Sequence, residues 1–121
     1  MLEPTIEPLL QSAVGVTVKT RVYPVKPPEG FALPMVVYSC DMMKSIWRTT
    51  GPTGAYTYKV TVETHAIDFL TVMDIAGAIR TALDGYKAQD IIDHCECTGA
   101  GAIEVENGYG YQLEFEVLAY V

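Results

Sequence analysis

Residues 55–85 read AYTYKVTVETHAIDFLTVMDIAGAIRTALDG and predict one strand followed by one helix. Residues 55–66 alternate between apolar and polar side chains, which is typical of a strand with one dry and one wet face. Asp68 is a good N-cap, and an apolar stripe at helical spacing follows it and stops at Asp84-Gly85. We therefore expect a long helix whose stripe lines the core. The stripe consists of Phe69, Leu70, Val72, Met73, Ala76, Ile79, Ala82 and Leu83.

The N-terminal part of the chain predicts a short helix, a short strand and a shaped loop. Thr5 caps the helix, and Gly15 is expected to end it. β-Branched residues and tyrosine favour a strand near residues 18–23. Residues 24–34 contain four prolines, which cannot donate hydrogen bonds to a strand ladder, so we expect an extended loop there.

A second strand is predicted at Met35–Lys44, and residues 45–54 connect it to the strand at 55–66. This connection is longer than a tight hairpin loop, so it is expected to project as an arm. The arm contains Ile46, Trp47 and Arg48, and tryptophan and arginine are enriched among interface anchors. The alternative for Trp47 is that it folds back onto its own core.

Two closing strands are predicted at residues 91–105 and 109–121, joined by Glu106-Asn107-Gly108. A three-residue loop with Gly108 in the left-handed conformation sets Ile103 opposite Tyr111 and keeps apolar side chains on one face. The other face then carries acids. The acidic side chains of this region are Glu104, Glu106, Glu114 and Glu116.

The order of these elements predicts an α+β fold: an antiparallel sheet with one long helix packed on it, a short N-terminal helix and a long projecting β-hairpin arm. A chain of 121 residues fits a single domain, 1–121. Its apolar content of 50% is enough for a globular core.

The charge of the chain is −7, from 8 basic and 15 acidic side chains, which argues against binding in the grooves of DNA. The charge is also uneven. Residues 1–60 carry six basic and four acidic side chains, whereas residues 61–121 carry two and eleven. If the two halves form different faces, head-to-tail contact between copies is attractive and leads to rings or filaments. The alternative is solvated charge without a role in assembly.

No pattern in the sequence indicates a catalytic centre, a metal site or a cofactor. Cys95 and Cys97 would share one face of a strand, His94 would point to the other, and no fourth ligand is evident. His65 has no marked nucleophile near it. Paired glutamates could serve as acid and base, but exposed strands normally carry charge for solubility. The odd number of cysteines argues against a disulfide scaffold. The acidic, proline-containing N-terminus and the absence of a long apolar run predict a cytoplasmic protein without a membrane partner.

Residues 21–24, RVYP, and 28–38, PEGFALPMVVY, resemble the R-I/V-Y-P element, the proline-rich turn and the P-aromatic-V/I-V strand of the siphophage tail-completion family. That family includes tail terminators and tail-to-head joining proteins. The order of elements is similar over nearly the whole chain, and Ala82-Leu83-Asp84-Gly85 matches the Ala-Leu-x-Gly helix end. Met35 departs from the pattern, because an aromatic residue often follows the proline.

The resemblance implies a small, non-catalytic virion protein that forms a ring, typically a hexamer, from subunits made in the host cytoplasm. Such a ring caps the tail tube, ends tail polymerisation and meets the head connector. Two hypotheses follow for this chain. Some of Glu104, Glu106, Glu114 and Glu116 face the channel, where they repel the phosphates of passing DNA. Trp47 and Arg48 contact the tail tube or a neighbouring subunit.

Two alternative hypotheses for the function also fit the sequence. One is a head-side connector or stopper ring, which sequence does not separate from a terminator. The other is a small-ligand-binding regulatory domain, which would need a preorganised polar pocket between a helix and a sheet.

Overall fold

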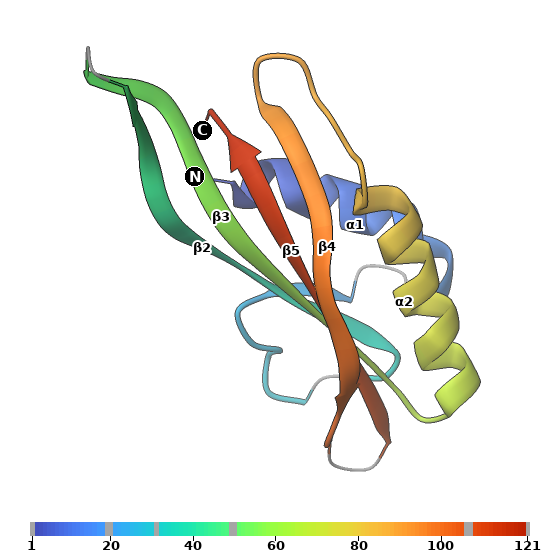
Figure 1. The fold of residues 1–121 in the computed structure, drawn as a ribbon. Helices are drawn as coiled ribbons and strands as arrows, with labels where there is room; N and C mark the ends of the chain where they lie inside the picture. The colour runs from blue at the N-terminus through green and yellow to red at the C-terminus, as the bar shows by residue number, and fades with distance from the viewer. Residues whose placement is uncertain (1, 19–20, 31, 49–50, 106–107, 121) are drawn as a thin grey trace.

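The computed structural model describes residues 2–18, 21–30, 32–48, 51–105 and 108–120, with the side chains at 16, 17, 47, 48, 51 and 52 left out of the description. It contains two helices and five strands (Figure 1). In chain order these are α1 (Glu3–Val18), β1 (Val22–Pro24), β2 (Met35–Arg48), β3 (Gly51–Ala66), α2 (Phe69–Leu83), β4 (Ile92–Ile103) and β5 (Tyr109–Ala119).

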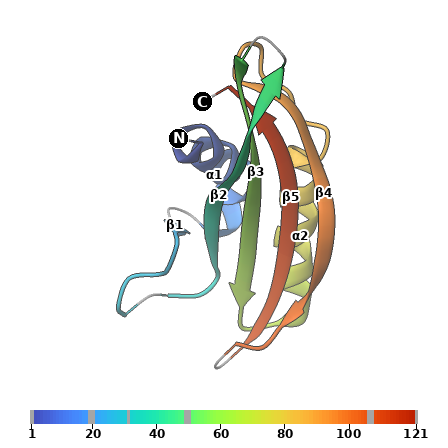
Figure 2. The same ribbon diagram turned by 60° about the vertical axis from the view of Figure 1, so that its left-hand side comes forward.

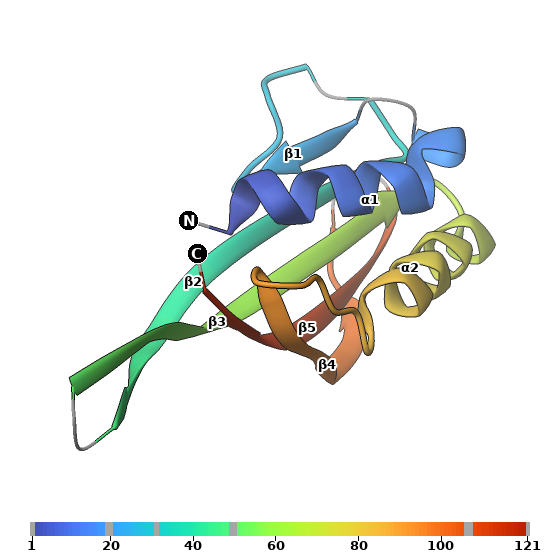
Figure 3. The same cartoon turned by 90° about the horizontal axis from the view of Figure 1, so that it is seen from above.

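The strands form one sheet in the order β1-β2-β3-β5-β4. The pairs β2–β3, β3–β5 and β4–β5 are antiparallel, whereas the three-residue β1 runs parallel to β2. The sheet is therefore mixed and not wholly antiparallel as predicted, because the short β1 pairs parallel to β2. Both helices lie on the same side of it, as the view from above shows (Figure 3). The predicted α+β fold is confirmed, including the helix packed on the sheet and the hairpin of β2 and β3 that extends beyond the other strands.

The core lies between the two helices and the sheet (Figure 2). Alternate residues of β3 and β5 point into it, and Val60, Val62 and Phe115 are fully buried. Burying apolar area at about 25 cal/mol per Å² is the main force that holds the helices on this face. The opposite face of the sheet has no helix on it in the described part of the chain. We call it the open face.

Helix α1 is longer than predicted. It continues through Gly15 to Val18 instead of ending at the glycine. Its buried residues recur every four positions, which holds the last turn against the sheet and offsets the cost of about 1 kcal/mol for glycine in a helix. These buried residues are Leu2, Ile6, Leu10, Val14 and Val18.

Helix α2 begins as predicted, with the Asp68 carboxylate accepting hydrogen bonds from the backbone N–H of Thr71 (2.8 Å) and from its hydroxyl (2.8 Å). Val72 and Ile79 are fully buried. The prediction that the stripe reaches the core from its first residue is wrong, because Phe69 is half exposed and Leu70 is 76% exposed. Leu70 lies about 200° around the helix from Val72, on the side away from the sheet. No helix among the described residues is both long and apolar enough to span a membrane.

The predicted register of β4 and β5 is wrong by one residue. Ile103 pairs with Gly110 instead of Tyr111, and Ala102 takes the place opposite Tyr111. The backbone of Gly108 passes so close to the end of β3 that a Cβ atom there would collide with the carbonyl oxygen of Ala66.

Candidate functional site

The open face of the sheet carries a row of charged side chains across its four long strands. Asp41 on β2 lies opposite Lys59 on β3, Lys59 lies opposite Glu116 on β5, and Glu116 lies opposite Glu96 on β4. Facing residues on neighbouring strands project to the same side of a sheet. One lysine therefore sits among three carboxylates, and the row is acidic.

Glu114 lies one row further along the open face, opposite Thr61. Its Oε1 atom is 3.4 Å from Lys59 Nζ and also accepts a hydrogen bond from Gln112 Nε2 (3.1 Å). Both members of the ion pair are partly exposed, so the pair contributes little to stability. The single positive charge of Lys59 is shared among several acids, so the ion pair offsets negative charge only close to Lys59.

The structure brings two of the four predicted glutamates together and places a third at one end of the sheet. Glu114 and Glu116 are on the open face, in agreement with the predicted acidic surface. Glu104 is exposed and immediately follows β4. Glu106 lies outside the described residues. Sequence analysis missed Asp41 and Glu96, which the pairing of β2 and β4 adds to the same face.

A depression of about 340 Å³ lies where the proline-rich loop crosses one end of the open face. Glu104 borders it together with Glu63 and His65, whose side chains approach each other to 3.4 Å. The proline-rich loop supplies apolar side chains to the wall of this depression. The remaining lining residues are Val25, Lys26, Pro27, Leu33, Met35, Val37 and Val105.

The arm, residues 45–54, is the end of the β2–β3 hairpin, in which Trp47 pairs with Pro52 and Arg48 with Gly51. Register shifts after Met42 and after Ser45 interrupt the ladder on the β2 side. The Thr53 hydroxyl donates to the carbonyl of Ile46 (2.9 Å), which ties the two strands together. The Ile46 side chain is half-buried, and the side chains of Trp47 and Arg48 are outside the description. Figure 1 shows that the hairpin extends past the ends of β4 and β5.

The cysteines are free thiols in structural positions. Burial raises the pKa of Cys95 from 9.0 to about 12, and burial together with nearby Glu3 raises the pKa of Cys40 to about 12. A thiol with so high a pKa is a poor nucleophile and a poor metal ligand at neutral pH. No group of three metal-ligating side chains occurs among the described residues. His94 is 3.5 Å from Glu96 and lies on the surface.

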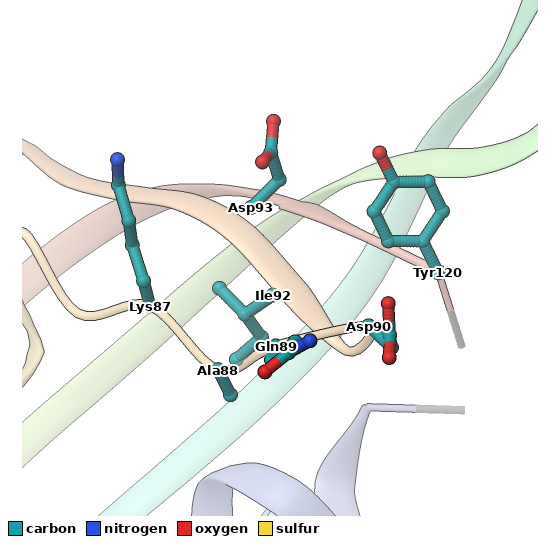
Figure 4. Close-up of a pocket in the computed structure, with 7 residues that line it drawn as sticks. All are labelled: Lys87, Ala88, Gln89, Asp90, Ile92, Asp93 and Tyr120. Carbon is teal, nitrogen blue, oxygen red and sulfur yellow. The ribbon is translucent and has the colours of Figure 1, made fainter.

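A second depression, of about 580 Å³, lies beside the start of β4 (Figure 4). Lys87, Asp93 and Tyr120 border it, and their side chains point to the same side of the backbone (Figure 4). The loop between α2 and β4 is held by a hydrogen bond from the Ala88 N–H to the Ile92 carbonyl (3.0 Å). The polar ends do not converge on one point, so this site lacks the preorganised contacts that a small-ligand pocket uses.

No protein-family model and no curated protein sequence matches the chain. Among solved structures, the fold is similar to a chain of the "Virion of native gene transfer agent (GTA) particle". The TM-score is 0.62 at 22% sequence identity, and the match covers 91% of this chain and 81% of that one. The two chains therefore share a fold over most of their length.

Proposed function

We propose that the protein is a structural, non-enzymatic subunit of a phage-like virion. In this proposal, copies form a ring, a hexamer by the family resemblance, that caps the tail tube, ends its polymerisation and joins the tail to the head connector. The observation that carries the proposal is the shared fold with a chain of a gene transfer agent virion over 91% of the sequence. The resemblance of residues 21–38 to the tail-completion family supports the same role independently.

The open face is the surface that we assign to the lumen of the ring. Its row of Asp41, Glu116 and Glu96 around Lys59 gives it a negative potential. Phosphates are repelled from such a wall, so DNA passes through without sticking. Glu104 and Glu114 extend the acidic surface toward the other end of the sheet.

The arm is the element that we assign to contacts outside its own subunit, with the tail tube protein or a neighbouring copy. The hairpin extends past the ends of the other strands, and contacts outside the subunit would explain this extra length. Ile46, Trp47 and Arg48 are the proposed anchors, because they combine an apolar, an aromatic and a cationic side chain near its tip.

The depressions and thiols support a binding role over an enzymatic one. Among the described residues, the acids, histidines and cysteines are arranged as surface pairs or buried thiols and do not converge on a shared reaction centre. A head-side connector or stopper ring remains the second candidate, because it would use the same fold, lumen and arm.

The location of the protein in the particle tests this proposal. Gold-labelled antibody against a tag at the exposed Gln89, in the loop between α2 and β4 and away from the proposed lumen, should mark the junction between head and tail in intact virions. Label along the tube, at the tail tip or absent from particles would contradict the proposal. Separated tails distinguish the two candidates, since a terminator stays with the tail and a connector stays with the head.

A further inference from the structure

Four large apolar side chains gather on the surface at the corner where β3 leads into α2 and β5 begins. Ile67 is 72% exposed and Leu70 is 76% exposed, and the half-exposed rings of Phe69 and Tyr109 meet edge to face with 5.9 Å between their centroids. We call this group the corner patch. A hydrophobic residue before an N-cap often packs onto the first turn of its helix, but Ile67 remains exposed. The patch is therefore apolar surface that the fold itself does not use.

A second exposed apolar site lies on the β2 strand beside the arm. Met42 is 60% exposed and Met43 is 63% exposed, and a register shift in the pairing with β3 falls at this point. Methionine side chains are unbranched and adapt to irregular partner surfaces. Lys44 follows them on the exposed strand, so the methionine pair has a basic neighbour toward the arm.

The two sites are complementary in charge. Asp68 lies between Ile67 and Phe69, and Asp74 lies one helical turn after Leu70, so exposed carboxylates border the corner patch. Lys44 and Arg48 follow the methionine pair toward the arm, whereas Asp41, which precedes it, lies opposite Lys59 in the acidic row. Apolar surface with an acidic rim at one site thus matches apolar surface with basic neighbours at the other.

The two sites also lie at opposite ends of the molecule. The hairpin with the methionine pair extends from one end of the sheet, and the turn from β3 into α2 lies at the other end (Figure 1). One copy cannot bring them together within itself, whereas two copies can. Two different surfaces in contact make a heterologous interface, which closes into a ring or continues as a filament.

We propose that the corner patch is the docking site for the methionine pair of a second copy of this chain. The inference deepens the proposed function, because it names the contact between ring subunits, but it stands on the isolated protein and its test does not involve virions. Each copy carries one methionine pair and one corner patch. An assembly held by this contact therefore grows by one copy at each step.

Sedimentation velocity of the purified protein, at concentrations up to about 1 mM, tests the inference. Leu70→Asp and Met43→Asp should each weaken self-association at least about tenfold, because each places a charge in a buried apolar contact. Val25→Asp is the matched control: Val25 is also 76% exposed but lies in the proline-rich loop and belongs to neither site. This control should associate as the unchanged protein does, and all variants should retain its melting temperature.

Mixing the two defective variants gives the decisive result. Leu70→Asp keeps an intact methionine pair and Met43→Asp keeps an intact corner patch, so an equal mixture should form dimers that do not grow further. A mixture that stays monomeric would overturn the inference. An unchanged protein that is monomeric at every concentration, or normal self-association of the Leu70→Asp variant, would also overturn it. Imaging of virions tests the proposed function separately, so the two can fail independently.

Discussion

Lys59 on β3 and Glu114 on β5 form an ion pair across the middle of the open face, with 3.4 Å between Nζ and Oε1. Lys59 also lies opposite Asp41 on one neighbouring strand and Glu116 on the other. Its single positive charge offsets only part of this negative charge. The face therefore stays acidic, which agrees with its proposed place on the wall of a channel that DNA passes through.

Reversing the acidic charge should impair DNA delivery but not particle assembly. We expect virions with Glu114→Lys and Glu116→Lys to assemble normally and to eject DNA poorly, because phosphates bind the new cations. Glu7→Lys with Asp93→Lys is the matched control, since Glu7 is exposed on α1, on the other side of the sheet, and both double variants change the net charge from −7 to −3. Infectivity and DNA release per particle are the measurements. Equal delivery by the two double variants would contradict a channel-facing role for these glutamates.

Shortening the arm should abolish tail joining and leave the subunit folded. Replacing residues 46–55 with Asn-Gly connects Ser45 to Tyr56, which already face each other in the ladder. Circular dichroism and melting should remain close to those of the intact protein. Joined virions in normal number would show that the arm makes no essential contact.

A single substitution at the arm tip tests its anchor. We expect Trp47→Ala to weaken binding to the partner by about 30-fold, the effect of losing a typical interface anchor of about 2 kcal/mol. Thr57→Ala, in the same hairpin but nearer the sheet, should bind within about twofold of the unchanged protein. The affinity for purified tail tubes is the measurement, and similar losses for both variants would indicate general damage to the hairpin.

Gly108 is required by a close backbone approach, so Gly108→Ala should destabilise the protein by about 1–3 kcal/mol. The added methyl group would collide with the Ala66 carbonyl and push the β4–β5 turn away from β3. Gly101→Ala is the control, because a Cβ there has no atom within 4 Å. Urea denaturation measures both, and equal stability of the two variants would contradict the described turn.

A buried thiol, Cys95, and a buried phenol, Tyr38, predict a loss of stability at high pH. The pKa of Cys95 rises from 9.0 to about 12 on folding, and that of Tyr38 from 10.0 to about 12, both mainly through burial. The unfolded chain therefore releases these protons first, so the free energy of unfolding should fall as pH rises from about 9 toward 12. Cys95→Ala should show a shallower fall. An identical pH profile for this variant would contradict burial of the thiol.

Hydrophobic periodicity was sufficient to predict the strand at 55–66 and most of α2. It also placed Glu114 and Glu116 on one polar face, because alternation along β5 fixes which side chains share a side. The same periodicity extended the core stripe through Phe69 and Leu70. The pattern describes one helix, and it contains no information on where the sheet beneath that helix ends.

Features set by contacts distant in sequence were not predictable. Gly15 stays helical because Val14 and Val18 on either side of it are buried in the core, and the pairing of β4 shifts near Asp93 and Thr98. The acidic row around Lys59 required both the pairing of β2 with β3 and that of β5 with β4. These pairings bring together residues from opposite ends of the chain, which local patterns do not encode.

The most direct test of the central proposal is the length of tails made without the protein. Negative-stain images of a lysate in which the gene is interrupted, beside the intact control, measure both joining and length. We expect full heads accompanied by separate tails of uncontrolled length. Normal joined virions would contradict it, and heads that leak DNA beside tails of normal length would assign the protein to the head-side connector.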